Sequence, residues 1–237
     1  MDVTWKIRLN SGSSTPPPAP HQSSPRLIAV GLCDEARNLF NRDCKILSTR
    51  VALCLSLSLT FSSPFHQRSK MSAEDAFTFL PQGAIVQEFR VAGHNIVQGF
   101  PTAEPYKTKN SAYFGETIGR VANRIKNAEI QNLNGKSYKL TANNGPNALH
   151  GGPAGWGKRI FDGPTPVNRN GTEAVQFKYL SKDGEEGYPG TVELRVWYIA
   201  SKKNDGGVDK TQLEIEYEVE LVGDEVEETL VSVTNHR

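Results

Sequence analysis

Cysteine, methionine and long apolar runs are scarce in this 237-residue sequence. The three cysteines are Cys33, Cys44 and Cys54. The residues after Cys54 can therefore form neither a disulfide framework nor a cysteine-ligated metal site. One apolar run, at residues 51–59, is far shorter than the ~20 residues that a membrane-spanning helix needs, and it lies too far along the chain for an ordinary secretory signal. The sequence therefore predicts no membrane partner, and a cytoplasmic location is the default expectation.

Other signatures of common function classes are absent as well. The 27 basic residues are balanced by 26 acidic ones and are scattered rather than clustered with aromatics, so we expect no nucleic-acid partner. His94, His150 and His236 show no metal-ligand spacing, which predicts no metal site. No Gly-x-Ser-x-Gly segment is found, so the commonest signature of a serine hydrolase is missing.

A change in composition near residue 70 divides the chain. The first seventy residues hold nine lysines and arginines against four aspartates and glutamates, whereas the remainder holds 18 against 22. Residues 11–24 are rich in Ser, Pro and Thr, a composition that does not build a packed core. We therefore expect residues 1–70 to be a disordered N-terminal extension, either a dispensable leader or an artefact of an upstream start codon, since Met71 is the only methionine after Met1. Residues 71–237 are expected to form the domain.

The pattern of that domain is β throughout. Short β-prone runs occur at 85–91, 95–100, 174–180 and 191–200, separated by Gly, Pro and Asn turns. Residues 212–222 alternate strictly between apolar residues and glutamates, which predicts a strand with one face in the core. We expect the four glutamates of this run to line a solvated sheet face. Many short strands without a helical period predict an all-β sandwich.

Site-like chemistry is concentrated at residues 114–152, FGETIGRVANRIKNAEIQNLNGKSYKLTANNGPNALHGG. Asn134-Gly135 between short apolar-polar runs is a strong hairpin signal. A hairpin there returns the chain to its starting point, so we expect Asn123 and Arg124 to lie near His150.

An amide, a guanidinium and an imidazole in one place suit a ligand that carries many hydroxyls. The residue types alone leave a plainer explanation open. An Asn-Arg pair is usually solvated surface, and a histidine after a Pro-Asn turn is usually a polar loop residue.

Four segments of the chain resemble one known family in the correct order. They are GETIGRVANRI at 115–125, NGKSYKLTANNGPNALHGG at 134–152, SKDGEEGYPGTVELRVWY at 181–198 and VSVTNH at 231–236. Together they resemble the aldose 1-epimerase (galactose mutarotase) family, and the resemblance covers about residues 71–237. It implies a large twisted antiparallel β-sandwich, here truncated, that interconverts the α and β anomers of hexoses such as galactose and glucose by acid/base ring opening. It implies a small-molecule aldose as partner and no cofactor.

The resemblance also implies roles for individual residues. His236 matches the general acid, and Asn123, Arg124 and His150 match residues that hold sugar hydroxyls. The family pattern continues beyond residue 237 with a sugar-binding aspartate and the catalytic glutamate. We therefore expect a fragment that lacks the catalytic glutamate and has little activity of its own. The alternative is a non-catalytic carbohydrate-binding β-sandwich that keeps Asn123, Arg124 and His150. A third possibility, a related enzyme that acts on hexose 6-phosphates, is disfavoured because no basic cluster accompanies the motif. The sequence gives no indication of an oligomeric state.

Overall fold

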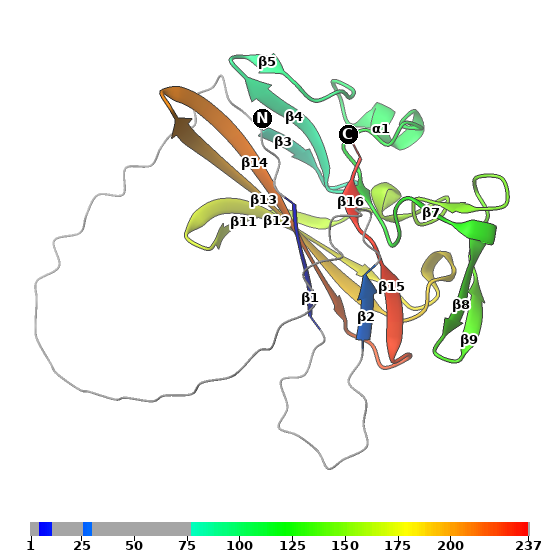
Figure 1. Cartoon of the computed structure of the whole chain (residues 1–237). Coiled ribbons are helices and arrows are strands. Elements are labelled where there is room, and N and C mark those ends of the chain that lie inside the picture. Colours follow the sequence, from blue (N-terminus) through cyan, green and yellow to red (C-terminus); the bar gives the residue numbers. More distant parts are fainter. Residues whose placement is uncertain (1–4, 11–25, 30–76, 237) are drawn as a thin grey trace, which may run out of the picture. The chain divides into compact units, whose positions relative to one another are not determined.

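The computed structural model describes residues 5–10, 26–29 and 77–236 of the chain. Strands dominate these residues, as the sequence analysis predicts for an all-β protein (Figure 1). Among them the only α-helix is the short α1 (Glu104–Thr108), and no helix has the length and apolar character that crossing a bilayer requires.

The largest sheet has the strand order β1-β14-β13-β12-β11. Its strands are β1 (Trp5–Asn10), β11 (Asp162–Arg169), β12 (Thr172–Ser181), β13 (Val192–Asp205) and β14 (Val208–Leu221). β11 to β14 form an antiparallel meander, and β13 and β14 remain paired from Val192–Leu221 to Asp205–Val208. The expected alternation is confirmed here, because Leu213, Ile215 and Val219 are buried in the core.

Part of the outer face of this sheet is shielded from water, so the expectation for its glutamates is wrong for two of them. Glu216 and Glu218 are only 6% and 8% exposed. Arg169 reaches both carboxylates from β11, and Arg195 reaches Glu218 from β13. Buried carboxylates persist only when they are paired. The sequence pattern showed the alternation but not the arginines that cross the neighbouring strands.

A second layer packs on the inner face of the large sheet. It is the antiparallel sheet of β3 (Phe77–Leu80), β4 (Ile85–Val91) and β5 (His94–Asn95). Buried residues from both layers form one core cluster, and the Tyr198 hydroxyl donates a hydrogen bond of 2.5 Å to the carbonyl of Ala84 across it. The two layers form the expected sandwich, since apolar faces of both are removed from water together.

Seven short strands complete the arrangement. They are β6 (Thr117–Ile118), β7 (Arg124–Ile125), β8 (Glu129–Leu133), β9 (Lys136–Lys139), β10 (Ala148–Leu149), β15 (Glu228–Val231) and β16 (Thr234–Asn235). Three-residue 3-10 helices lie at Lys126–Ala128, Trp156–Lys158 and Glu185–Gly187 and are labelled η2, η3 and η4. Residues of β7, β8, β9, β10 and β15 contribute to a second apolar cluster.

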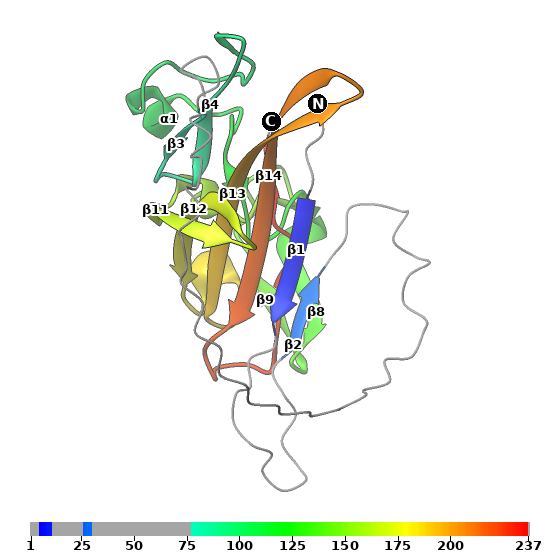
Figure 2. The same cartoon turned by 90° about the vertical axis from the view of Figure 1, so that its left-hand side faces the viewer.

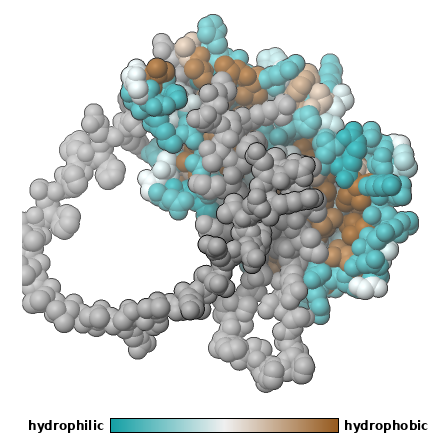
Figure 3. All heavy atoms as spheres, in the orientation of Figure 1, coloured by the Kyte–Doolittle hydropathy of each residue, from teal (hydrophilic) through white to brown (hydrophobic). Residues whose placement is uncertain are grey.

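The expected hairpin is present at Asn134-Gly135. Leu133 pairs with Lys136, so the turn has two residues, and both have positive φ, at 50° and 72°. Such a turn matches the twist of the two strands that it joins. Figure 3 shows a hydrophilic outer surface on this hairpin, with hydrophobic residues on its inner side.

Two short strands precede the expected domain. β1 pairs in parallel with β14, and β2 (Arg26–Ala29) pairs in parallel with β15 (Figures 1 and 2). These two strands add to sheet edges that a strand can extend. The expected disordered or artefactual extension at 1–70 stays a prediction. The other residues of that range lie outside the described ones, and whether the extension belongs to the natural protein stays a prediction.

Candidate functional site

The chain returns to its starting point as the hairpin signal predicted. β7 pairs antiparallel with β10, so Arg124 lies opposite Leu149. The next residue, His150, donates its backbone N–H to the carbonyl of Asn123 at 3.0 Å. Asn123, Arg124 and His150 are therefore neighbours although β8 and β9 separate them in sequence.

Arg124 is exposed and held by neutral groups. Its Nε donates to Oδ1 of Asn144 at 3.0 Å, and its Nη1 donates to Oδ1 of Asn123. The guanidinium carries five N–H donors, and three of them have no partner in the part of the chain that the structure describes. The arginine is thus fixed in direction but open to a ligand.

His150 is buried, with 8% exposure, and no described residue bonds its Nδ1. Burial lowers the pKa of His150 to about 4, with smaller effects from His236 and Arg124. The following Gly151 has φ of +82°, and a Cβ there would lie 1.8 Å from the carbonyl oxygen of Gly119. Only glycine allows this close approach, which brings the His150 turn against the backbone of Gly119.

His236 reaches the same place from the far end of the chain. β16 pairs with β6, and the backbone of His236 exchanges two 2.8 Å hydrogen bonds with Gly115 and Glu116. The rings of His150 and His236 lie 5.2 Å apart, edge to face. The Nδ1 of His236 has no partner among the described residues, and burial lowers its pKa. Burial therefore disfavours the charged form of both imidazoles.

Tyr113 is a member of this cluster that sequence reasoning missed. Its ring centroid lies 4.9 Å from that of His150 and 5.6 Å from that of His236. Tyr113 immediately precedes the motif-rich stretch, and an aromatic residue beside a glycine turn was the only signal available in the sequence. Together, Tyr113, His150 and His236 are called the ring cluster below.

Glu116 is the carboxylic acid beside the ring cluster, yet it is not placed to act on a ligand. It is fully buried, and its Oε1 accepts hydrogen bonds from Lys158 Nζ at 2.5 Å and Asn110 Nδ2 at 2.7 Å. Burial raises the pKa of Glu116 to about 7, against the opposing effects of Lys158 and Asn110. A side chain without exposed surface cannot touch a ligand, so Glu116 is not placed to act as a base on one.

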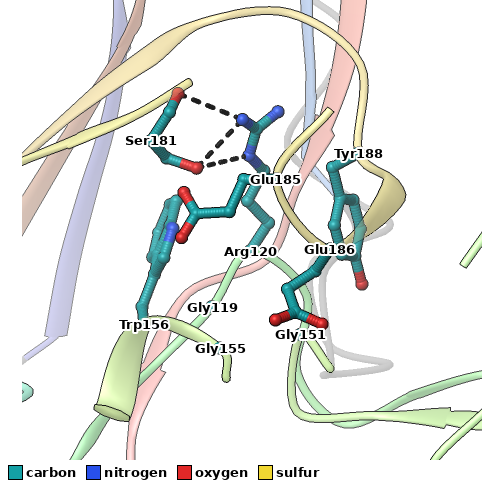
Figure 4. A pocket seen from close by; sticks show the side chains of 9 residues that line it. All are labelled: Gly119, Arg120, Gly151, Gly155, Trp156, Ser181, Glu185, Glu186 and Tyr188. Carbon is teal, nitrogen blue, oxygen red and sulfur yellow. Dashed lines mark hydrogen bonds between the residues drawn. The ribbon is translucent and has the colours of Figure 1, made fainter. Parts of the chain in front are cut away.

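The loop between β12 and β13 is tied down by a buried arginine. Arg120 is 1% exposed and donates to the carbonyl and hydroxyl oxygens of Ser181, as Figure 4 shows, and to the carbonyl of Pro189 at 2.8 Å. Asp183 accepts a hydrogen bond from the N–H of Gly190 at 2.6 Å, which closes the turn of this loop. The narrow space that Arg120, Trp156 and Tyr188 line has no room for a water molecule, so this region shapes the fold.

No group of three or more His, Cys, Asp or Glu side chains that could hold a metal ion occurs among residues 77–236. The candidate site instead combines the open guanidinium of Arg124 with the two imidazoles and the tyrosine ring of the ring cluster. The protein is therefore an antiparallel β-sandwich with a polar candidate site.

Comparison with known proteins places this sandwich in a family. The family model described as aldose 1-epimerase matches residues 70–237, and the chain belongs to that family. It is 44% identical to bovine (Bos taurus) galactose mutarotase over 143 residues, which are 60% of this chain and 36% of the bovine protein. It is 36% identical to the bifunctional protein gal10 of Schizosaccharomyces pombe over 156 residues, 65% of this chain and 21% of that protein.

A solved structure supports the same fold. The crystal structure of an aldose epimerase homologue from C. elegans superposes with a TM-score of 0.55 and 33% sequence identity, over 67% of this chain and 45% of the other. The predicted fold class, a galactose mutarotase-like antiparallel β-sandwich, is confirmed. The chain spans about a fifth to a third of the length of the curated relatives that it matches.

Proposed function

We propose that this chain carries the hexose-binding part of an aldose 1-epimerase site, with galactose or glucose as the sugar. In this proposal the free donors of Arg124, the Asn123 amide and His150 bind ring hydroxyls, and His236 faces the ring oxygen. The observation that carries it is the convergence of Arg124, His150 and His236, which come from three separate segments, with polar atoms that no described residue satisfies. Buried polar atoms without a partner are rare in folded proteins and suit a site that a ligand completes.

Interconversion of anomers requires more than binding. A base takes the proton from the C1 hydroxyl while an acid protonates the ring oxygen, the C1–O5 bond opens, and the ring closes on its other face. To serve as that acid His236 must be an imidazolium, but burial lowers its pKa and no described carboxylate offsets this effect. We therefore propose that turnover needs a carboxylate from outside the described residues, and that residues 1–237 alone bind hexose with little turnover.

The alternative, a non-catalytic carbohydrate-binding sandwich, is favoured by the same absence of a carboxylate partner for His236 within the described residues. The two functions share the sugar site and differ in turnover. Polarimetry of fresh α-D-galactose separates them when it is run on the chain alone and on a natural, longer form of the protein if one exists. Acceleration by the longer form supports the epimerase, and inertness of every form supports the binding module.

The binding site itself is tested by titration of D-galactose into the 237-residue chain, followed by NMR. We expect Arg124→Ala to weaken galactose binding by about 10- to 100-fold, because a charge-assisted hydrogen bond to a hydroxyl is lost. Lys126→Ala is the matched control, since Lys126 is an exposed cation two residues away. Equal affinity of wild type and Arg124→Ala, or equal losses in both variants, would contradict the assignment.

A further inference from the structure

The orientation of the two imidazoles in the ring cluster depends on packing. Within the described residues neither His150 nor His236 makes a side-chain hydrogen bond. The hydrogen bonds of both residues are made by their backbone atoms. The flat ring of Tyr113 contacts both, edge-on to His150 at 69° and tilted at 42° to His236. Aromatic contacts of this kind prefer defined angles and restrict the rotation of each ring.

Tyr113 is itself held from its other side. Lys158, in η3, places its ammonium 4.8 Å from the centre of the Tyr113 ring. That ammonium is fixed by Glu116 Oε1 at 2.5 Å and by the carbonyl of Asn110 at 3.0 Å. A cation over an aromatic face is attracted by the negative face of the ring, and the attraction is stronger where water is excluded.

The backbone of Tyr113 adds an independent indication. Its φ is +57°, a left-handed conformation that is unfavourable for a bulky residue. The turn is closed by the N–H of Glu116, which donates to the carbonyl of Tyr113, and by Asn110, whose Oδ1 accepts from the N–H of Phe114. Strained conformations of this kind persist where the surroundings enforce them, and they gather at functional sites.

We propose that Tyr113, clamped by the Glu116–Lys158 pair, is a positioning residue that orients His150 and His236 for a hexose; this rests on the function proposed above. Tyr113 acts through the imidazoles. The ring is the part that matters, since both contacts and the cation involve its faces and edges. The hydroxyl is secondary. Lys158 and Glu116 act one step further away, by fixing the ring.

The test compares Tyr113→Ala with Tyr113→Phe in the 237-residue chain. Tyr113→Ala is expected to shift and broaden the imidazole nitrogen signals of His150 and His236 in the sugar-free protein, and to weaken D-galactose binding about tenfold. Tyr113→Phe keeps the ring and is expected to restore both signals and to bind within about twofold of wild type. Tyr138→Ala is the matched control, because Tyr138 has a lysine ammonium 5.0 Å from its ring centre on the β8–β9 hairpin.

A second variant covers the case in which Tyr113→Ala does not fold. Glu116→Gln combined with Lys158→Met removes both charges together and leaves no unpaired buried ion. We expect smaller shifts of the same imidazole signals and about threefold weaker galactose binding, because the cation on the ring is lost.

The outcomes separate this proposal from the function on which it rests. Unchanged imidazole signals and unchanged galactose affinity in Tyr113→Ala overturn the positioning role, and so does a Tyr113→Phe variant that loses as much as Tyr113→Ala. If the wild-type chain binds no galactose while Tyr113→Ala still moves both imidazole signals, the proposed function fails and the positioning role stands.

Discussion

The outer face of the large sheet and the candidate site hold similar polar groups in different states. On the sheet, Arg195 pairs with the carboxylates of Glu218 at 2.9 Å and Glu220 at 3.1 Å. At the candidate site, Arg124 bonds only neutral amide oxygens, and two imidazole nitrogens lack partners among the described residues. Groups paired with opposite charges stabilise the fold, whereas unsatisfied ones are available to a ligand.

The largest effect that tests this comparison is on stability. Arg195→Met removes the partner of several carboxylates, among them the buried Glu218, and we expect a loss of about 2 to 3 kcal/mol in the free energy of unfolding. The matched Arg124→Met variant is expected to change the free energy of unfolding by less than about 0.5 kcal/mol, because Arg124 is exposed and pairs with no acid among the described residues. Urea unfolding measures both. Equal losses in the two variants would contradict the distinction between charge-paired and open arginines.

A smaller effect appears in the pH dependence of stability near the cluster. The pKa of Glu116 is raised from 4.5 to about 7 by burial, so between these values the unfolded chain has released a proton that the folded chain keeps. Glu116 therefore makes the folded state less stable as pH rises from about 4.5 to 7. Glu116→Gln is expected to gain stability relative to wild type over that window, by about 1 to 2 kcal/mol.

His150 changes the free energy of unfolding with pH in the opposite direction and serves as the control. Its pKa is lowered from 6.5 to about 4, so the unfolded chain binds a proton that the folded chain does not, and this contribution makes the folded state more stable as pH rises from 4 to 6.5. In His150→Gln this rise is expected to disappear. Urea unfolding at several pH values gives both differences, and parallel curves for wild type and either variant would refute the assigned shift.

The sequence was informative where structure is local and silent where partners are distant. Asn134-Gly135 predicted the hairpin, and alternation predicted β14, because turn conformation and strand period are set by neighbouring residues. The same alternation could not show that Glu218 is buried, since that depends on an arginine from another strand.

The candidate site shows the same division. The fold-back correctly placed Asn123 and Arg124 beside His150, because one ribbon joins them. The contact of Tyr113 with the Lys158 ammonium was missed, because Lys158 lies in η3, far from Tyr113 in the sequence. The roles of Asn123, Arg124, His150 and His236 toward a sugar remain predictions.

The smallest effect probes whether the hairpin is independent of the site. Gly135 has φ of +72° and its added Cβ would contact nothing within 4 Å, so Gly135→Ala introduces backbone strain alone. We expect a loss of about 0.5 to 1 kcal/mol in the free energy of unfolding, with galactose affinity within about twofold of wild type. Gly151→Ala is the contrasting variant, because its Cβ would collide with the Gly119 carbonyl at the site. Isothermal titration with D-galactose, run beside urea unfolding, decides between them. A Gly135→Ala variant that loses as much galactose affinity as Gly151→Ala would show that the hairpin turn, and not only the β7–β10 pairing, holds Arg124 beside His150.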